Sequence, residues 1–194
     1  MRALFLVLFL LPSALSAQKP SASLAVAPPQ QIEVELRHAM VGDWAGVLEY
    51  RDYSESDTST KRVQLPAWLN ISSSGDTLTE RFIYDDGPTK VVEETLTLAF
   101  NVAASTYQIT SDKNRTESYR VEGYSALHAG LGSLIITGPT IDNNRPAETR
   151  IVLTVRRNLL TWTEENRAVA TEPYIFRHSY TFTRATAPKV TRPQ

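Results

Sequence analysis

The sequence predicts an all-β protein, an antiparallel up-and-down β-barrel of about 8–10 strands that follows one short N-terminal helix. Two observations predict this fold. The spacing of apolar residues changes from four to two after Gly42, and the rest of the chain falls into short alternating segments separated by turn-forming residues. A wide sheet leaves unpaired edges unless it closes, so a barrel is favoured over the alternative, a two-sheet sandwich. The short connections also favour the barrel, because sandwiches contain longer crossovers.

The chain begins with the layout of a secretory signal peptide. Arg2 supplies a positive start, residues 3–11 are continuously apolar, and small residues follow as far as Ala17. We expect cleavage before Gln18, which makes residues 1–17 the signal peptide. The apolar run is far shorter than the roughly 20 residues of a membrane-spanning helix. We therefore expect a secreted or periplasmic protein with no membrane span after cleavage.

Three further regions follow the predicted signal peptide. Residues 18–30 place prolines among serine and alanine, which predicts a flexible linker. Residues 31–185 are predicted to form one β-barrel domain, a domain count that fits a chain of 194 residues. Residues 186–194 are polar and contain proline, which predicts a disordered tail.

The elements of the barrel domain follow from the spacing of apolar residues. Ile32, Leu36 and Met40 lie four residues apart and predict one short amphipathic helix, which Gly42 ends. Beyond it, apolar residues recur at every second position, the period of a strand with one buried face. The segment 61–73 is either two strands or one strand bent at Pro66, because proline cannot donate to a ladder. The other predicted strands are residues 43–53, 77–84, 90–100, 106–111, 116–124, 130–137, 148–156, 159–166 and 173–184.

Composition excludes several classes of function. The chain has 20 Lys and Arg against 21 Asp and Glu, and this balance excludes a phosphate-driven nucleic-acid binder, which normally has a strong basic excess. There is no cysteine, so disulfides, thiolate metal sites and a cysteine nucleophile are excluded. His38, His128 and His178 are far apart and form no metal-binding pattern, so we expect no metal.

The start of the first strand carries a family likeness. Gly42-Asp43-Trp44 directly after the helix, followed by an up-and-down meander, resembles the lipocalin and wider calycin superfamily. Its motif is a Gly-x-Trp at this place, with a basic residue on the closing strand lying across the tryptophan. The resemblance implies that Arg184 covers Trp44. The chain also resembles lipocalin-like bacterial exported proteins of unassigned function, in which Gly-Asp-Trp-x-Gly and a segment like residues 142–147 recur.

The closing strand carries the strongest hint of function. Tyr174, Phe176, His178, Tyr180 and Phe182 alternate onto one face, which is aromatic with a single imidazole. If this face points inward, His178 lies inside the barrel and contacts a ligand. A sharper hypothesis is an axial haem ligand, since imidazole is the usual protein donor to iron and small haem barrels resembling nitrobindin place a histidine on the closing strand. The alternatives are a buried, hydrogen-bonded histidine or an outward one after a register slip.

We expect the interior to bind a small, mainly hydrophobic molecule by burying it among aromatic and aliphatic side chains. The candidate ligand-binding residues are Leu48, Tyr50, Phe82, Trp162, Phe176, His178 and Tyr180. The alternative is a non-enzymatic envelope or protein-interaction module, with a filled core and a functional surface loop. The side chains of that loop either bind an anion or partner, or satisfy their own backbone. Its residues are Asp142, Asn143, Asn144 and Arg145, with Arg150 as a further charge carrier.

No catalytic arrangement stands out, so we do not expect an enzyme. Ser125 has His128 nearby but lacks the second glycine of the Gly-x-Ser-x-Gly elbow. Glu164 and Glu165 point to opposite faces of a predicted strand, so they cannot act as a paired acid and base. The sequence contains no glycine-rich phosphate loop.

Overall fold

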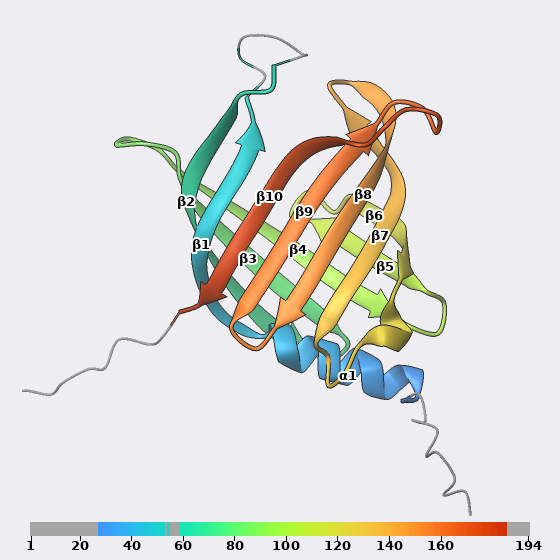
Figure 1. Ribbon diagram of the computed structural model, residues 1–194. Coiled ribbons are helices and arrows are strands. Elements are labelled where there is room, and N and C mark those ends of the chain that lie inside the picture. Colours follow the sequence, from blue (N-terminus) through green and yellow to red (C-terminus); the bar gives the residue numbers. More distant parts are fainter. Residues whose placement is uncertain (1–26, 53, 55–58, 186–194) are drawn as a thin grey trace, which may run out of the picture.

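The computed structural model describes residues 27–52, 54 and 59–185. The predicted signal peptide, most of the predicted linker and the predicted tail lie outside the described residues. Ten antiparallel strands close into one barrel, and one α-helix lies across one end of it (Figure 1). The predicted fold, an all-β barrel with a short N-terminal helix, is confirmed.

The barrel is an uninterrupted meander in which each strand pairs with its neighbours in sequence and β1 pairs with β10 to close the sheet. The segment around Pro66 is one strand, in which this proline lies opposite Val47. The helical elements are α1 (Pro29–Met40) and a 3-10 turn, η1 (Tyr124–Ala126). The strands are β1 (Gly42–Arg51), β2 (Arg62–Ser74), β3 (Thr77–Asp85), β4 (Val91–Asn101), β5 (Thr106–Ser111), β6 (Thr116–Glu122), β7 (Gly132–Asp142), β8 (Arg145–Arg156), β9 (Leu159–Arg167) and β10 (Ile175–Arg184).

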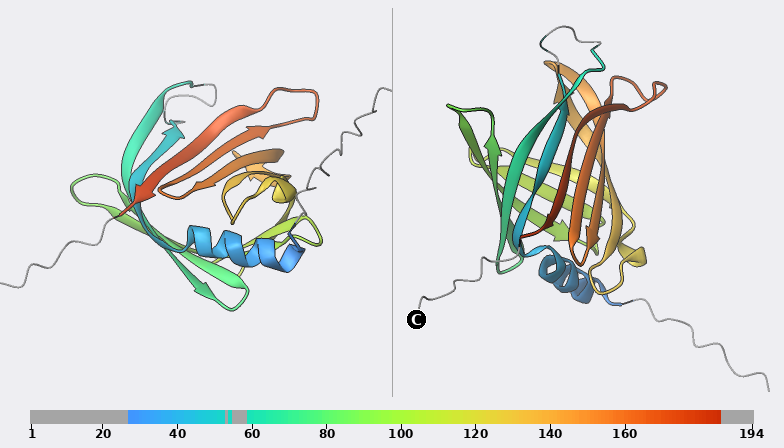
Figure 2. Two further views of the ribbon diagram at one scale, coloured as in Figure 1. Left: turned by 60° about the horizontal axis from the view of Figure 1, so that its bottom comes forward. Right: turned by 60° about the vertical axis from the view of Figure 1, so that its left-hand side comes forward.

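The helix α1 covers one mouth of the barrel (Figure 2). It begins at Pro29, which lies inside the segment predicted as linker. Proline is favourable in the first helical turn because an N–H at that position has no partner within the helix. Ile32, Leu36 and Met40 are buried on its barrel side, as their spacing predicted. Among the described residues, no helix combines the length and apolarity needed to cross a membrane.

Arg184, at the end of β10, connects the closing strand to the beginning of the barrel. Its guanidinium carbon lies 4.3 Å from the ring centroid of Trp44, so the contact implied by the family resemblance is present. The same guanidinium donates hydrogen bonds to the carbonyl oxygens of Ala39 (2.6 Å) and Val41 (2.9 Å). Gly42 has φ +138°, and a Cβ there would lie 2.5 Å from Nη1 of Arg184, so only glycine fits.

The interior changes character along the barrel axis. Near α1 the inward side chains are large, apolar and buried, and they fill the barrel. These filling residues are Leu36, Met40, Trp44, Leu78, Leu98, Leu134 and Phe182. Toward the opposite mouth the inward positions become polar, as Glu117 on β6 and Glu164 on β9 show. The barrel is therefore packed at one end, and any binding space lies at the other.

We predict that Arg184→Ala lowers the free energy of unfolding by about 2–4 kcal/mol, because it removes the covering of Trp44 and three charge-assisted hydrogen bonds, to the carbonyl oxygens of Ala39, Val41 and Arg157. Urea denaturation followed by tryptophan fluorescence measures this change. Arg156→Ala, at an exposed position on β8, is the matched control and is expected to change stability by no more than about 0.5 kcal/mol. Equal effects of the two substitutions would contradict a special role for Arg184.

Candidate functional site

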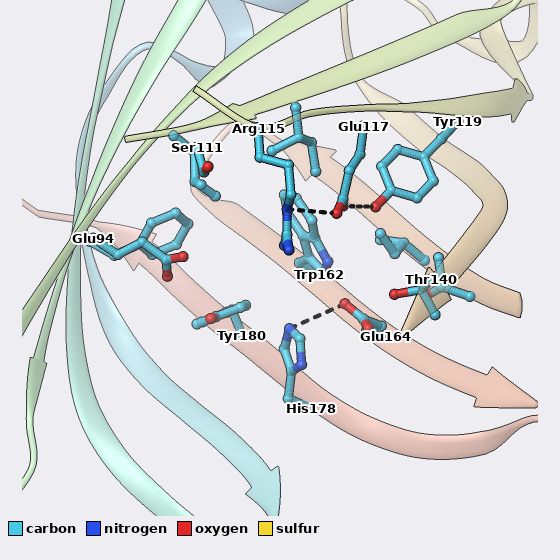
Figure 3. Close-up of a pocket in the computed structure, with 15 residues that line it drawn as sticks. Glu94, Ser111, Arg115, Glu117, Tyr119, Thr140, Trp162, Glu164, His178 and Tyr180 are labelled. Carbon is cyan, nitrogen blue, oxygen red and sulfur yellow. Dashed lines mark hydrogen bonds and ion pairs between the residues drawn. The ribbon is translucent and has the colours of Figure 1, made fainter. Parts of the chain in front are cut away.

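A cavity of about 230 Å³ lies inside the barrel at the mouth opposite α1 (Figure 3). Its wall includes His178 near the beginning of β10 and Glu164 near the end of β9, which are the strand ends remote from the helix. At roughly 30 Å³ per water, the space holds about seven or eight water molecules. The lining residues are Phe82, Glu94, Leu96, Ile109, Ser111, Arg115, Glu117, Tyr119, Thr140, Thr149, Ile151, Trp162, Glu164, His178 and Tyr180.

Four of the seven predicted ligand-binding residues line this cavity: Phe82, Trp162, His178 and Tyr180. The rings of Phe82 and Tyr180 lie 5.3 Å apart, and the ring of His178 meets Tyr180 edge-on at 5.3 Å. His178 and Tyr180 occupy alternate positions on the inward face of β10, and Phe82 contacts Tyr180 from β3, so the three rings form a continuous aromatic wall.

Leu48 and Tyr50 lie on the inward face of β1 but outside the cavity wall. Leu48 is opposite Tyr180, and Tyr50 is opposite His178. Leu48 packs against the hydrophobic core beside Tyr180.

Phe176 lies on the outer face of the barrel, so the prediction that it faces inward is wrong. The register of β10 shifts between Phe176 and His178, where Arg177 is an extra residue in a bulge. The bulge reverses the alternation, and Phe176 pairs with Glu165. The guanidinium carbon of Arg62 lies 3.8 Å from its ring centroid. Periodicity alone could not reveal this change of face.

The predicted surface loop at Asp142 to Arg145 is a tight hairpin turn, so the prediction of a separate loop between the strands is wrong. Asp142 ends β7 and pairs with Arg145, which begins β8. Asn143 and Asn144 form the turn with φ +46° and +59°, left-handed values that asparagine tolerates. Arg150 lies within β8 and forms an ion pair at 2.6 Å with a carboxylate of β9.

Sequence reasoning missed most of the polar residues in the cavity. They lie on β4 to β9 and include Glu94, Arg115, Glu117 and Thr149. The available signal was alternation itself, since Glu94 lies two residues before the inward Leu96. A charged residue at an inward position of a strand marks a site where the interior is not simply apolar.

Glu117 is satisfied by its own surroundings. The Arg115 guanidinium lies 3.2 Å from its Oε1, and the Tyr119 hydroxyl donates to its Oε2 at 2.5 Å (Figure 3). Burial, followed by the neighbouring Glu117 charge, raises the pKa of Tyr119, so this hydroxyl remains a donor. The negative charge of Glu117 is therefore largely balanced within the cavity wall.

Glu94 accepts a chain of phenolic hydrogen bonds. The Tyr84 hydroxyl lies 3.3 Å from Oε2 of Glu94 and 3.1 Å from the Tyr180 hydroxyl. Burial raises the pKa of both phenols well above the ordinary value, so both stay protonated. Tyr180 can then donate to Tyr84, which donates to Glu94 at the cavity mouth.

His178 and Glu164 face each other with 3.6 Å between Nε2 and Oε2 (Figure 3). Burial, with a smaller effect of the Arg177 charge, lowers the pKa of His178 to about 4. Burial also raises the pKa of Glu164, although Arg177 opposes that shift. At neutral pH the imidazole is therefore uncharged, and the contact is not an ion pair.

The Trp162 Nε1 group has no hydrogen-bond partner among the described residues. The side chain belongs to the cavity wall, and only 9 % of the residue is exposed. Buried donors in native proteins almost always have a partner, which is protein, water or ligand. An acceptor inside the cavity would satisfy this N–H.

The cavity does not fit haem as it stands. Its volume is below the roughly 300–1,000 Å³ of pockets for drug-sized ligands, and a porphyrin is larger than most of those ligands. Across residues 27–52, 54 and 59–185, no three His, Asp or Glu side chains are placed to hold a metal ion.

The comparisons with known proteins show the fold alone. A scan against models of known protein families found no match. A search of curated protein sequences also found none. Among solved structures, the chain is similar to the crystal structure of Rv2717c from M. tuberculosis, with a TM-score of 0.53 and 14% sequence identity over 84% of this chain and 100% of that chain. This likeness supports the barrel and leaves the lipocalin-like resemblance a prediction.

Glu80 lies just below the cavity, on the inward face of β3 opposite the lining residue Leu96. It is 1% exposed, and its Oε2 has no hydrogen-bond partner among the described residues. Burial, followed by the charge of Glu94, raises its pKa from 4.5 to about 8. The folded protein thus holds a neutral carboxylic acid beneath the site at pH 7.

We predict that Glu80 makes folding stability fall as pH rises from about 4.5 to 8, because only the unfolded chain ionises this group in that window. Its contribution to the slope is up to about 1.4 kcal/mol per pH unit. Glu80→Gln is expected to remove this contribution, which urea denaturation at several pH values measures. Glu93→Gln, a change at an exposed position of β4, is the control. Identical pH profiles of the two variants would contradict the buried neutral acid.

Proposed function

We propose that this protein binds a small molecule of mixed polarity in the open end of its barrel. The observation that carries the proposal is the cavity itself, with a buried and unpaired Trp162 Nε1 in its wall. Small-molecule sites combine apolar walls with a few placed polar groups. Phe82 and Ile151 supply apolar wall here, and Glu164 and His178 supply polar groups.

The polarity of the lining changes the expected ligand. A mainly hydrophobic molecule would displace water from Glu94 and Glu164 without offering them a hydrogen bond, which is unfavourable for polar and charged groups. A molecule with a short apolar body and polar groups at its ends satisfies both parts of the wall. The proposed ligand is therefore smaller and more polar than a typical lipid.

We propose that the protein performs this function outside the cytoplasm. The support is the sequence of residues 1–17, which has the charge, apolar run and small residues of a signal peptide. Binding without catalysis fits the wall as described, because Glu164 points inward and Glu165, its neighbour in sequence, pairs with Arg150 on the outer face.

A second candidate is an interaction module that uses the outer lip of the barrel. A groove of about 890 Å³ lies there, and Phe176 and Tyr174 form part of its wall. Arg62 covers Phe176, and Arg167 lies 4.4 Å from the ring centroid of Tyr174. Stacked arginine and aromatic side chains are common in protein interfaces, which is the observation that favours this candidate.

We predict that Ser111→Phe, on the inward face of β5, fills the cavity and abolishes binding of small molecules. Saturation-transfer NMR with a panel of fragments of about ten non-hydrogen atoms measures the binding. Gln108→Phe introduces the same side chain at an exposed position of the same strand and should leave fragment binding unchanged. Fragments that bind both variants and the wild type equally would place the binding elsewhere and favour the outer groove.

A further inference from the structure

We propose that the cavity selects a small organic cation that also carries a hydrogen-bond acceptor. This inference rests on the proposed binding function and specifies the chemical class of the ligand. Its basis is the combination of Glu94 and Glu164, an aromatic wall and the Trp162 donor, which has no hydrogen-bond partner among the described residues. Figure 3 shows Glu94, Glu164 and Trp162 around the same space.

The carboxyl groups of Glu94 and Glu164 face the cavity from opposite sides (Figure 3). Within the part of the chain that the structure describes, Glu94 forms no ion pair with a lysine or arginine, and its hydrogen-bond partner is the neutral Tyr84. A cation between the two carboxyl groups would interact favourably with both.

The aromatic wall of the cavity also favours a cation. Phe82, Trp162 and Tyr180 all line the cavity. The faces of aromatic rings attract ammonium groups, and the attraction is stronger where water is partly excluded. The wall therefore favours an alkylated ammonium group over a hydrated inorganic ion, because methyl groups also gain from contact with the rings.

The Trp162 donor favours a ligand that also carries a hydrogen-bond acceptor. Its Nε1–H is buried and has no partner among the described residues, and such a donor has an energetic cost in a folded protein. A cation without an acceptor would leave this cost in place, whereas a hydroxyl or carbonyl oxygen on the same molecule would remove it. The ligand is therefore expected to present a positive end and an oxygen.

The positive groups near the cavity do not cancel this preference. Arg115 is 77% exposed in its side chain and is paired with Glu117. Arg177 forms an ion pair with Asp142 at 3.4 Å. His178 is uncharged at neutral pH, because burial lowers its pKa to about 4. Glu94 has no cationic partner among the described residues, whereas Glu164 is also influenced by the charge of Arg177.

Choline and its neutral isostere, 3,3-dimethylbutan-1-ol, test the inference because they share a shape and a hydroxyl and differ in charge. We expect choline to bind the full mature chain at least tenfold more tightly than the isostere does. Calorimetry measures the two affinities, and NMR chemical-shift changes of the Trp162 indole signal locate the binding. Glu164→Gln should weaken choline binding about tenfold and leave the isostere unchanged. Glu165→Gln, the neighbouring change on the outer face, should affect neither probe, and folding of each variant is checked by circular dichroism.

The outcomes separate this inference from the proposed function. Equal or tighter binding of the neutral isostere, or an unaltered choline affinity in Glu164→Gln, would overturn the choice of a cation and leave the binding function standing. Failure of choline, the isostere and the fragment panel to bind would overturn both. Tighter binding of 3,3-dimethylbutanoate, the matched anion, would assign the site to Arg115 in place of the carboxyls.

Discussion

The contact between Arg184 and Trp44 holds together the parts of the chain on which the barrel depends. An up-and-down barrel has one seam between its first and last strands, and here β1 and β10 form it. Arg184 reaches across that seam and donates to the carbonyl oxygen of Val41, 143 residues away in sequence. Trp44 in turn donates its Nε1 to the Met40 carbonyl oxygen at 2.9 Å, which fixes the end of α1. One arginine therefore links the seam, the helix and the packed end.

The packed end makes the open end possible. On β9 the inward residues pass from Leu160 through Trp162 to Glu164, and on β4 they pass from Leu98 to Glu94. A barrel of this kind needs buried apolar area for stability, and the half beside α1 supplies it. The other half can then keep polar side chains that would weaken a smaller core. The half of the barrel beside α1 stabilises the fold, and the other half is available for binding.

The same gradient controls the charge of the acidic residues. Glu94 lies at the solvent-exposed mouth and is accessible to water, whereas Glu80 lies below it and is held neutral by burial. Glu164 is intermediate in depth, with 18% of its side chain exposed. Burial raises the pKa of both Glu80 and Glu164, so depth in the barrel governs how readily these two carboxyl groups become charged.

The contact of Arg184 with Trp44 followed from the family resemblance. The sequence by itself determined the fold class, the helix and the strand boundaries to within about five residues. These features are local, since a two-residue period, a turn residue or a helix-ending glycine can be identified without knowing the neighbours in space. It also pointed to Phe82, Trp162, His178 and Tyr180, because unbroken alternation carried each of them inward.

Only the tertiary structure decided which polar residues share the cavity. The wall is assembled from β3 to β10, so its composition depends on the register of every strand pair around the barrel. The bulge at Arg177 sends Phe176 outward, and a single extra residue leaves no mark in the pattern of side chains. The turn at Asn143 and Asn144 was predicted as part of a surface loop. The pairing of β7 and β8, which the sequence does not reveal, makes it a tight turn with a left-handed backbone. Local periodicity specifies each strand, whereas strand register, which depends on contacts distant in sequence, specifies the site.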